Sequence, residues 1–497
     1  MPSLPAKYII YLDIDTLRAD HLSCYGYHRK TTPNLDAIAA EGARLTNFYC
    51  PDSPCLPSRT ALFSGRFGIN TGVVNHGGTY ADLRVEGPGR GFRSTHSQNA
   101  LGERLRRAGW YTVSISPFPY RHTAYHVWEG FRECFDPGRG GLERADEVWP
   151  YVERWLRSNR QREKWFLHVN LWDPHTPYDV PLDYGSPFAA DPPPSWLTQK
   201  HIDAQRASYG WHEAVMTHGD WVTGRDRWLR GTPSINNLKD FKTWIDGYDT
   251  GIHYADSYAG RLVALLKELG LYEQTAIVVS ADHGENHGEL EVWGDHQTAD
   301  QFTHNVPLIV RWPGLTEGRA GRAFTGLHYN VDLASTLVEL AGGDVPAVWD
   351  GVSFAETLRS GRDCGREFLV LSHGAWSCQR SLRWDSYLFI RTYHTGHKNF
   401  PSYMLFDLKD DPHETRNLAK ERPELVHRAL ATLEAWVTEQ LRGTGQPDPL
   451  LGVIADGGPL HARDARVGPL LDRLRQTGRA HHAEWLEKHG GKPRDEG

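Results

Sequence analysis

The chain has 497 residues, of which 39% are hydrophobic and 24% are charged, and its formal net charge is −7 at pH 7. This length allows more than one domain around a large core, and the composition is that of a soluble globular protein. The absence of a basic surplus argues against nucleic acid as a main partner, but an anionic substrate bound by local positive charge stays open.

The N-terminal segment predicts a buried strand, because residues 8–12 are apolar and Asp13 follows them. This run is too short for the apolar core of a signal peptide, and no run is long enough to span a bilayer. We therefore expect a cytoplasmic protein without membrane contact. The six cysteines show no CxxC pairing, which favours reduced thiols over a structural zinc site or a redox dithiol.

Helical and strand-like patterns alternate along the first part of the chain. Helices are predicted at residues 33–42, 99–108 and 248–269, and strands at residues 110–115, 165–170, 275–280 and 307–312. This alternation indicates an α/β fold in which helices flank a mostly parallel central sheet. Active sites of such sheets lie beyond the carboxyl ends of the strands. The polar residues that follow predicted strands are therefore candidates: Asp13, Asp15, Asp173, His175, Asp282 and His283.

Changes in composition predict three regions: a catalytic domain at 1–360, an antiparallel α+β subdomain at 361–442, and a helical, polar extension at 443–497. Within the first region, residues 182–240 are rich in Pro, Gly, Trp and His, which predicts an irregular insertion near the active site. In the other two regions we expect strands at 368–372, 381–392 and 402–408, and helices at 423–441 and near 464–487.

The strongest chemical signal is Cys55-Leu56-Pro57-Ser58-Arg59, which continues into Thr60 to Arg66. It resembles the CxPSR maturation motif of the type I sulfatases, a family of the alkaline phosphatase superfamily with an alkaline-phosphatase-like fold. A lone buried cysteine before a helix would be ordinary, but further family-like motifs follow in the right order. The resemblance implies that a formylglycine-generating enzyme oxidises Cys55 to formylglycine, whose hydrate is the nucleophile that attacks the sulfur of a sulfate ester.

Two further segments carry the resemblance to the metal site of this family. They are Asp15-Thr16-Leu17-Arg18 after the first strand and Ser280-Ala281-Asp282-His283-Gly284-Glu285 after a later one. They imply one divalent metal ion bound by Asp15, Asp282, His283 and the modified Cys55. Ligands rich in oxygen favour Ca²⁺, and the imidazole also admits Mn²⁺ or, less readily, Zn²⁺. Asp13 lies on the same strand face as Asp15, as an extra ligand or a supporting group.

The remaining candidates hold the ester and move protons. Arg59 and the metal would hold the sulfate oxygens, and His175, in a PHxP-like segment, would face the sulfate. The family's GKWHxG segment is replaced here by Ser116–Pro119, so the following Arg121 and His122 are the substitutes. A lysine of the family is replaced by His296, a candidate acid for the leaving group, and His76 is a candidate for the pocket wall.

We therefore expect hydrolysis of sulfate monoesters of a small molecule or a saccharide. A phosphonate or phosphate mono- or diesterase of the same superfamily is the main alternative, and an inactive binding homologue is a further one. A cysteine phosphatase is disfavoured because Arg59 lies four residues after Cys55 rather than six. The resemblance covers roughly residues 8–440, so it includes neither the insertion at 182–240 nor the tail after residue 443. The oligomeric state stays open, a homo-oligomer included.

Overall fold

A computed structural model describes residues 6–86, 93–138, 140–218, 229–463 and 466–495. Its centre is an eight-stranded sheet in the order β11-β2-β10-β7-β1-β6-β4-β5. The sheet is mostly parallel, because only β10 runs antiparallel to both of its neighbours. Its strands are β1 (Tyr8–Ile14), β2 (Ala43–Tyr49), β4 (Tyr111–Ile115), β5 (Glu133–Phe135), β6 (Trp165–Leu171), β7 (Thr275–Ser280), β10 (Leu308–Arg311) and β11 (Arg322–Tyr329).

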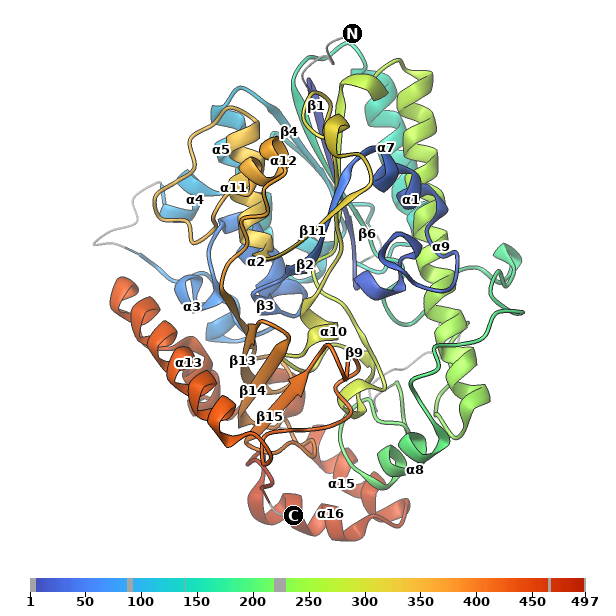
Figure 1. Cartoon of the computed structure of the whole chain (residues 1–497), viewed down its shortest axis with the longest axis vertical. Helices are drawn as coiled ribbons and strands as arrows, with labels where there is room; N and C mark the ends of the chain where they lie inside the picture. The colour runs from blue at the N-terminus through green and yellow to red at the C-terminus, as the bar shows by residue number, and fades with distance from the viewer. Residues whose placement is uncertain (1–5, 87–92, 139, 219–228, 464–465, 496–497) are drawn as a thin grey trace.

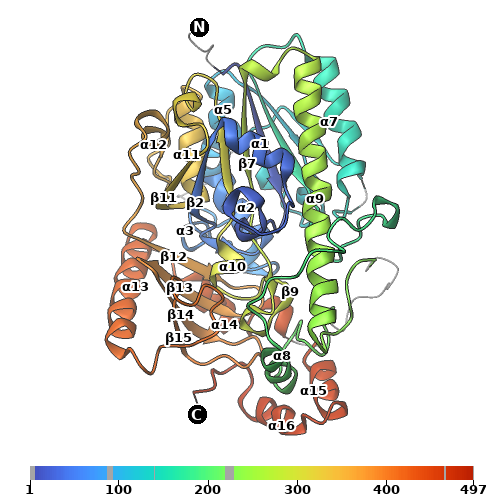
Figure 2. The ribbon, with the colours of Figure 1, turned by 45° about the vertical axis from the view of Figure 1, so that its right-hand side comes forward.

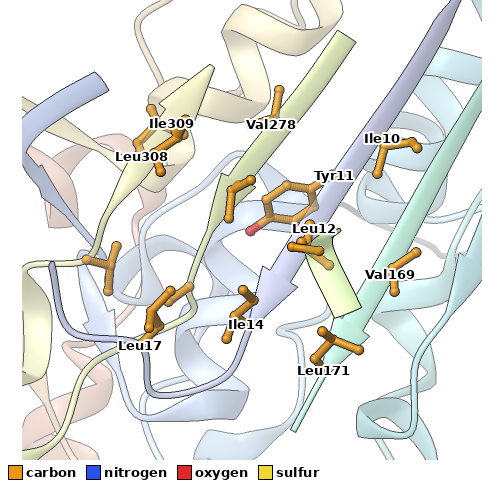
Figure 3. Close-up of a cluster of buried hydrophobic side chains, with 14 of the residues drawn as sticks. Ile10, Tyr11, Leu12, Ile14, Leu17, Val169, Leu171, Val278, Leu308 and Ile309 are labelled. Atoms are coloured by element: carbon orange, nitrogen blue, oxygen red, sulfur yellow. The ribbon is translucent and has the colours of Figure 1, made fainter. Parts of the chain in front are cut away.

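Strand β1 lies in the middle of the sheet and pairs in parallel with β6 and β7. All seven of its residues are buried, as expected for a parallel strand that is covered on both faces. Apolar side chains of β1, β6, β7 and β10 form the core that Figure 3 shows. In the register, Asp13 of β1 lies beside Ser280 of β7 and Asn170 of β6, so the three carboxyl ends meet at one edge.

Helices cover both faces of this sheet (Figures 1 and 2). One face carries α1 (Pro33–Glu41), α7 (Ala145–Asn159) and α9 (Leu238–Glu268). The other carries α2 (Cys55–Ser64), α5 (Leu101–Arg107), α11 (Asn330–Leu340) and α12 (Ala355–Ser360). This arrangement confirms the predicted α/β class. No helix in the described part of the chain is both long and apolar enough to cross a membrane.

A second, smaller sheet follows the main one and is antiparallel except for one short edge strand. It contains β3 (Asp52–Ser53), β12 (Phe368–His373), β13 (Cys378–Trp384), β14 (Tyr387–His394) and β15 (Tyr403–Asp407). Helix α13 (Pro423–Thr444) packs on its outer side (Figure 1). Because β3 pairs with β12 just before Cys55, this sheet is joined directly to the segment that opens α2.

The C-terminal extension folds back onto the rest of the chain. It contains α14 (Pro449–Ala455), α15 (Val467–Gln476) and α16 (Ala480–His489), and residues 464–465 lie outside the described part. Asp448 forms a buried ion pair with Arg380 of β13 at 2.5 Å. Arg479 forms another with Glu213, at 2.6 Å, in the segment predicted as an insertion. That segment also contains α8 (Gln199–Ala207), and its residues 219–228 lie outside the described residues.

Three predicted elements differ in their limits. The helix expected at 248–269 begins ten residues earlier, where the Asn237 side chain caps the first turn of α9. The strand expected at 381–392 is a hairpin of β13 and β14, which turns at Asp385 with a φ of 43°, a conformation that Asp tolerates. The helix expected near 464–487 is two helices, which Gly478 separates with a φ of 77°.

Several elements are not predicted by the sequence patterns. Helix α7 contains Pro150, which lacks a backbone N–H and so weakens any helical reading of the sequence. Strand β11 is interrupted by a bulge between Phe324 and Leu327, and this breaks the pattern by which a strand is recognised. The remaining short elements are α3 (Gly68–Thr71), α4 (Thr95–Asn99), α6 (Phe118–Arg121), α10 (Gln301–His304), β8 (Asn286–His287) and β9 (Trp293–Asp295).

Candidate active site

The candidate site lies at the carboxyl edge of the main sheet. Asp13 is the last residue but one of β1 and Asp15 follows that strand, while Asp282 and His283 follow β7. Cys55 is the first residue of α2, whose ten residues are all buried. Two strand ends and one helix start therefore bring these side chains together, although Asp15 and Asp282 are far apart in sequence.

Asp15, Cys55, Asp282 and His283 each offer one ligand atom, and these atoms all lie within 4.8 Å of one another. Cys55 Sγ is 3.0 Å from His283 Nε2. The other ring nitrogen of His283, Nδ1, lies 2.9 Å from the carbonyl oxygen of Gly284, to which it donates its proton. This contact leaves the Nε2 lone pair directed at the cluster, which is the orientation that a metal-binding histidine needs.

Arg59 is buried among three carboxylates one turn after Cys55. Its guanidinium nitrogens lie 3.0 Å from Asp13 and 3.0 Å from Asp15, and one of them contacts Asp282 more closely still. Asp13 also lies 3.5 Å from His168 Nε2. Within the described residues Asp13 is in neither group that could hold a metal ion, so the geometry places it behind Arg59 as a supporting group.

The residues present fit a divalent cation. Among the described residues, neither oxygen of Asp15 accepts a hydrogen bond, although both are buried. Burial and the neighbouring carboxylate of Asp282 raise the pKa of Asp15, and burial raises the pKa of Asp282 to about 6. Three carboxylates face one guanidinium, so the ionised cluster carries an excess of two negative charges. A divalent ion would balance that excess and supply the missing partner of Asp15.

His175 and His296 lie beside this cluster. The ring centroid of His296 is 4.1 Å from that of His283 and 5.6 Å from that of His175. His175 donates from Nδ1 to the carbonyl oxygen of Thr176 at 2.6 Å, which leaves Nε2 as its free acceptor. Burial lowers the pKa of both histidines well below the usual range, so both are neutral at neutral pH.

The other three predicted pocket residues lie on the far side of Cys55. Arg121 Cζ is 4.1 Å from the ring of Trp172, and its charge acts on Cys55 and Asp15. The ring centroids of His122 and His76 are 5.1 Å apart. His76 Nε2 is 3.5 Å from the backbone nitrogen of Leu56, the residue after Cys55. The structure therefore gathers every predicted site residue at one edge of the sheet.

Sequence reasoning missed the residues that close this site from other parts of the chain. His461 of the C-terminal extension lies 2.9 Å from His76, and His212 lies 3.0 Å from Asp295, next to His296. Trp376 lies between them, with ring centroids 4.9 Å from His461 and 5.3 Å from His212. No local motif marks these residues among the 26 histidines of the chain, because only the tertiary fold brings them to the site.

Two family models match this chain. The model described as "Sulfatase" matches residues 7–343, which include the whole cluster around Cys55. The model described as "N-sulphoglucosamine sulphohydrolase, C-terminal" matches residues 288–438, which include the second sheet and most of α13. Neither matched range includes the extension after residue 444.

Similar proteins and solved structures agree with these matches. An arylsulfatase of Clostridium perfringens is 23% identical over 475 residues, which cover 85% of this chain and 93% of the relative. A structure solved in complex with its substrate D-glucosamine-2-N,6-O-disulfate has a TM-score of 0.70 at 19% identity, covering 89% of this chain and 99% of that one. A phosphonate monoester hydrolase of Agrobacterium radiobacter has a TM-score of 0.66 at 20% identity, with coverage of 88% and 96%.

Proposed function

The chain belongs to the sulfatase family of the alkaline phosphatase superfamily and is a sulfuric ester hydrolase, and from that premise we propose a mechanism and a substrate class. It hydrolyses sulfate monoesters to an alcohol and inorganic sulfate, with Cys55 oxidised to formylglycine as the nucleophile. The observation that carries this proposal is the gathering of Cys55, Arg59 and the ligand set of Asp15, Asp282 and His283 at one sheet edge.

The position of Cys55 suits a nucleophile that is made by modification. Burial and the nearby carboxylates of Asp15 and Asp282 raise the pKa of its thiol well above the usual range. The unmodified thiol is therefore protonated at neutral pH and is a weak nucleophile. This electrostatic setting argues against direct thiolate chemistry and favours an oxygen nucleophile at the same place.

Arg59 has two tasks in this mechanism. Its guanidinium offsets part of the charge of the three carboxylates, and it holds the start of α2 against β1 and β7. We assign a divalent cation, Ca²⁺ rather than Mn²⁺, to Asp15, Asp282, His283 and residue 55; when bound it would neutralise charge and polarise a sulfate oxygen. Arg121, on the open side of the cluster, attracts the anionic ester toward Cys55.

His175 and His296 are the candidates for proton transfer to the leaving alcohol. Both are neutral, and both lie beside the cluster around Cys55. Asp295 Oδ1 lies 3.5 Å from His296 Nε2 and would stabilise the imidazolium of that ring. The mixture of histidines and tryptophans around these residues suits a sulfated saccharide, and the fold is shared with a protein solved with a disulfated glucosamine.

Mass spectrometry of the peptide that contains Cys55 tests the nucleophile. The protein is made together with a formylglycine-generating enzyme, and conversion of the thiol to an aldehyde lowers the peptide mass by about 18 Da. A Cys55→Ser variant gives the matched control, because it keeps the fold and removes the site of modification. An unmodified thiol in protein that hydrolyses sulfate esters would refute the formylglycine mechanism.

Hydrolysis of phosphonate or phosphate esters is the second candidate, and the similarity of the fold to that of a phosphonate monoester hydrolase is the observation that favours it. Values of kcat/KM for 4-nitrophenyl sulfate, phenyl phenylphosphonate and a phosphodiester, measured on one preparation, separate the two. We expect the sulfate ester to be the best of the three. A higher kcat/KM for the phosphonate would replace our proposed function.

A further inference from the structure

The C-terminal extension reaches the active site through one histidine. His461 lies in the 3-10 turn Leu460–Ala462, beyond both matched ranges. Its Nε2 is 2.9 Å from Nδ1 of His76, and its Nδ1 is 3.2 Å from Nη1 of Arg466. His76 Nε2 in turn faces the backbone nitrogen of Leu56 at 3.5 Å. A continuous line of contacts therefore runs from Arg466 to the first turn of α2.

The donors and acceptors along this line determine where the protons sit. A guanidinium can only donate, so the Nδ1 atom of His461 that faces Arg466 must be the acceptor. A neutral His461 then carries its proton on Nε2 and donates it to Nδ1 of His76. His76 must in turn carry its own proton on Nε2. The long contact with the Leu56 N–H is the one that yields, and the Nε2–H of His76 is left directed at the pocket beside Cys55.

Both imidazoles are neutral, as this argument requires. Burial and the neighbouring His296 and His283 lower the pKa of His76 well below its usual range. Burial, His76 and the charge of Arg466 do the same for the pKa of His461. A neutral imidazole has only one N–H, so the partner of one nitrogen decides what the other nitrogen can do.

The extension is held firmly enough to impose this arrangement. The backbone nitrogen of His461 donates to the carbonyl oxygen of Ala375 at 3.0 Å, and the ring of Trp376 lies 4.9 Å away. Leu460 packs so closely against Gly77 that a Cβ atom there would come within 2.6 Å of it. The segment that carries His76 and the turn that carries His461 are therefore fixed against each other.

We propose that Arg466 and His461 are positioning residues that hold His76 as its Nε2–H tautomer, so that His76 donates a hydrogen bond to an oxygen of the ester bound beside Cys55. This inference rests on the proposed function only for the identity of the ester. His76 and His461 are both partly exposed, unlike the fully buried Cys55 and His283, so a substrate can reach them. The extension thus completes one wall of the active site.

Nuclear magnetic resonance of ring-labelled histidine tests the tautomer without any need for activity. Two-bond ¹H–¹⁵N correlations distinguish the Nε2–H and Nδ1–H forms of a neutral imidazole, and a His76→Gln variant identifies the His76 signals. We expect the Nε2–H form in the native chain, its loss in His461→Leu, and its retention in His461→Gln, whose amide both accepts from Arg466 and donates to His76. A native Nδ1–H form, or an Nε2–H form unchanged in His461→Leu, would overturn the proposal.

Kinetics on the same variants test the consequence for catalysis. We expect His461→Leu to lower kcat/KM on an aryl sulfate about 10- to 100-fold, the range for loss of a residue that orients a functional group. His461→Gln should stay close to the native value. His481→Leu, the same change at an exposed histidine of the same extension, is the control for damage to the fold.

The two readouts separate failure of this inference from failure of the proposed function. If no sulfate ester is hydrolysed, the proposed function fails, while the tautomer still decides whether His461 positions His76. If esters are hydrolysed and His461→Leu and His461→Gln lose activity equally, hydrogen bonding by residue 461 is not what matters and the proposal is wrong.

Discussion

Replacing Asp13 by Asn tests whether this carboxylate supports Arg59 or binds metal. Asp13 Oδ2 receives two nitrogens of Arg59, Nε at 3.0 Å and Nη2 at 3.0 Å. Asn keeps one oxygen acceptor but loses the charge, so the expected loss is one charge-assisted contact, about 1.5–3 kcal/mol. If that contact orients Arg59 in the transition state, kcat/KM on an aryl sulfate falls about 10- to 100-fold.

Metal content by mass spectrometry completes the assay. Asp13→Asn should retain one metal ion per chain, whereas Asp15→Asn should lose it, because only Asp15 belongs to the ligand group. Asp256→Asn is the matched control: it changes a buried aspartate of α9 that accepts from the backbone of Leu35 at 2.8 Å. Loss of metal from Asp13→Asn as complete as from Asp15→Asn would refute the supporting role.

Three further outcomes are expected. Removal of divalent ions with a chelator should abolish activity and lower the melting temperature, since it leaves uncompensated carboxylates, and added Ca²⁺ should restore both better than Mn²⁺; unchanged melting would count against a resident cation. Burial raises the pKa of Asp52 to about 7, so its contribution to stability is full below about pH 4 and is lost as the pH rises through 7. Asp52→Asn should therefore flatten the pH dependence of melting between these values, and an unaltered slope would contradict the assignment. Gly65→Ala should destabilise the chain by about 2–4 kcal/mol, because Gly65 has a φ of 70° and a Cβ would meet the Trp349 ring at 2.2 Å; denaturant unfolding that matches the native curve would disprove this clash.

The parts of the site that the sequence predicts are those whose chemistry is local. Asp15 and Asp282 each follow a buried apolar strand, and parallel strands necessarily bring such residues to one edge. Cys55 and Arg59 lie one helical turn apart, so their proximity needs no tertiary information. The central sheet can be predicted for the same reason, from continuous apolar runs such as that of β7.

The rest depends on how distant segments dock. His461 reaches His76 because Leu460 fits against Gly77, and nothing near either histidine in sequence announces that contact. Glu213 and Arg479 form their buried pair between two segments that the sequence assigns to different regions. The hairpin of β13 and β14 resembles one strand in the sequence because Asp385 is a weaker turn signal than Gly, although the left-handed conformation is open to it.

The exchange of lysines for histidines gives the site a charge that suits a monoanion. With a divalent ion bound, the charges of the three carboxylates are balanced by the metal and Arg59, and Arg121 remains as the one positive charge near Cys55 among the described residues. The neutral rings of His175 and His296 add N–H groups without adding charge. A sulfate monoester carries one negative charge and matches Arg121, whereas a phosphate monoester dianion would leave one charge uncompensated in a desolvated pocket. Histidines in place of lysines therefore favour esters with a single negative charge, and this is the physical reason to rank sulfate monoesters above phosphate monoesters for this chain.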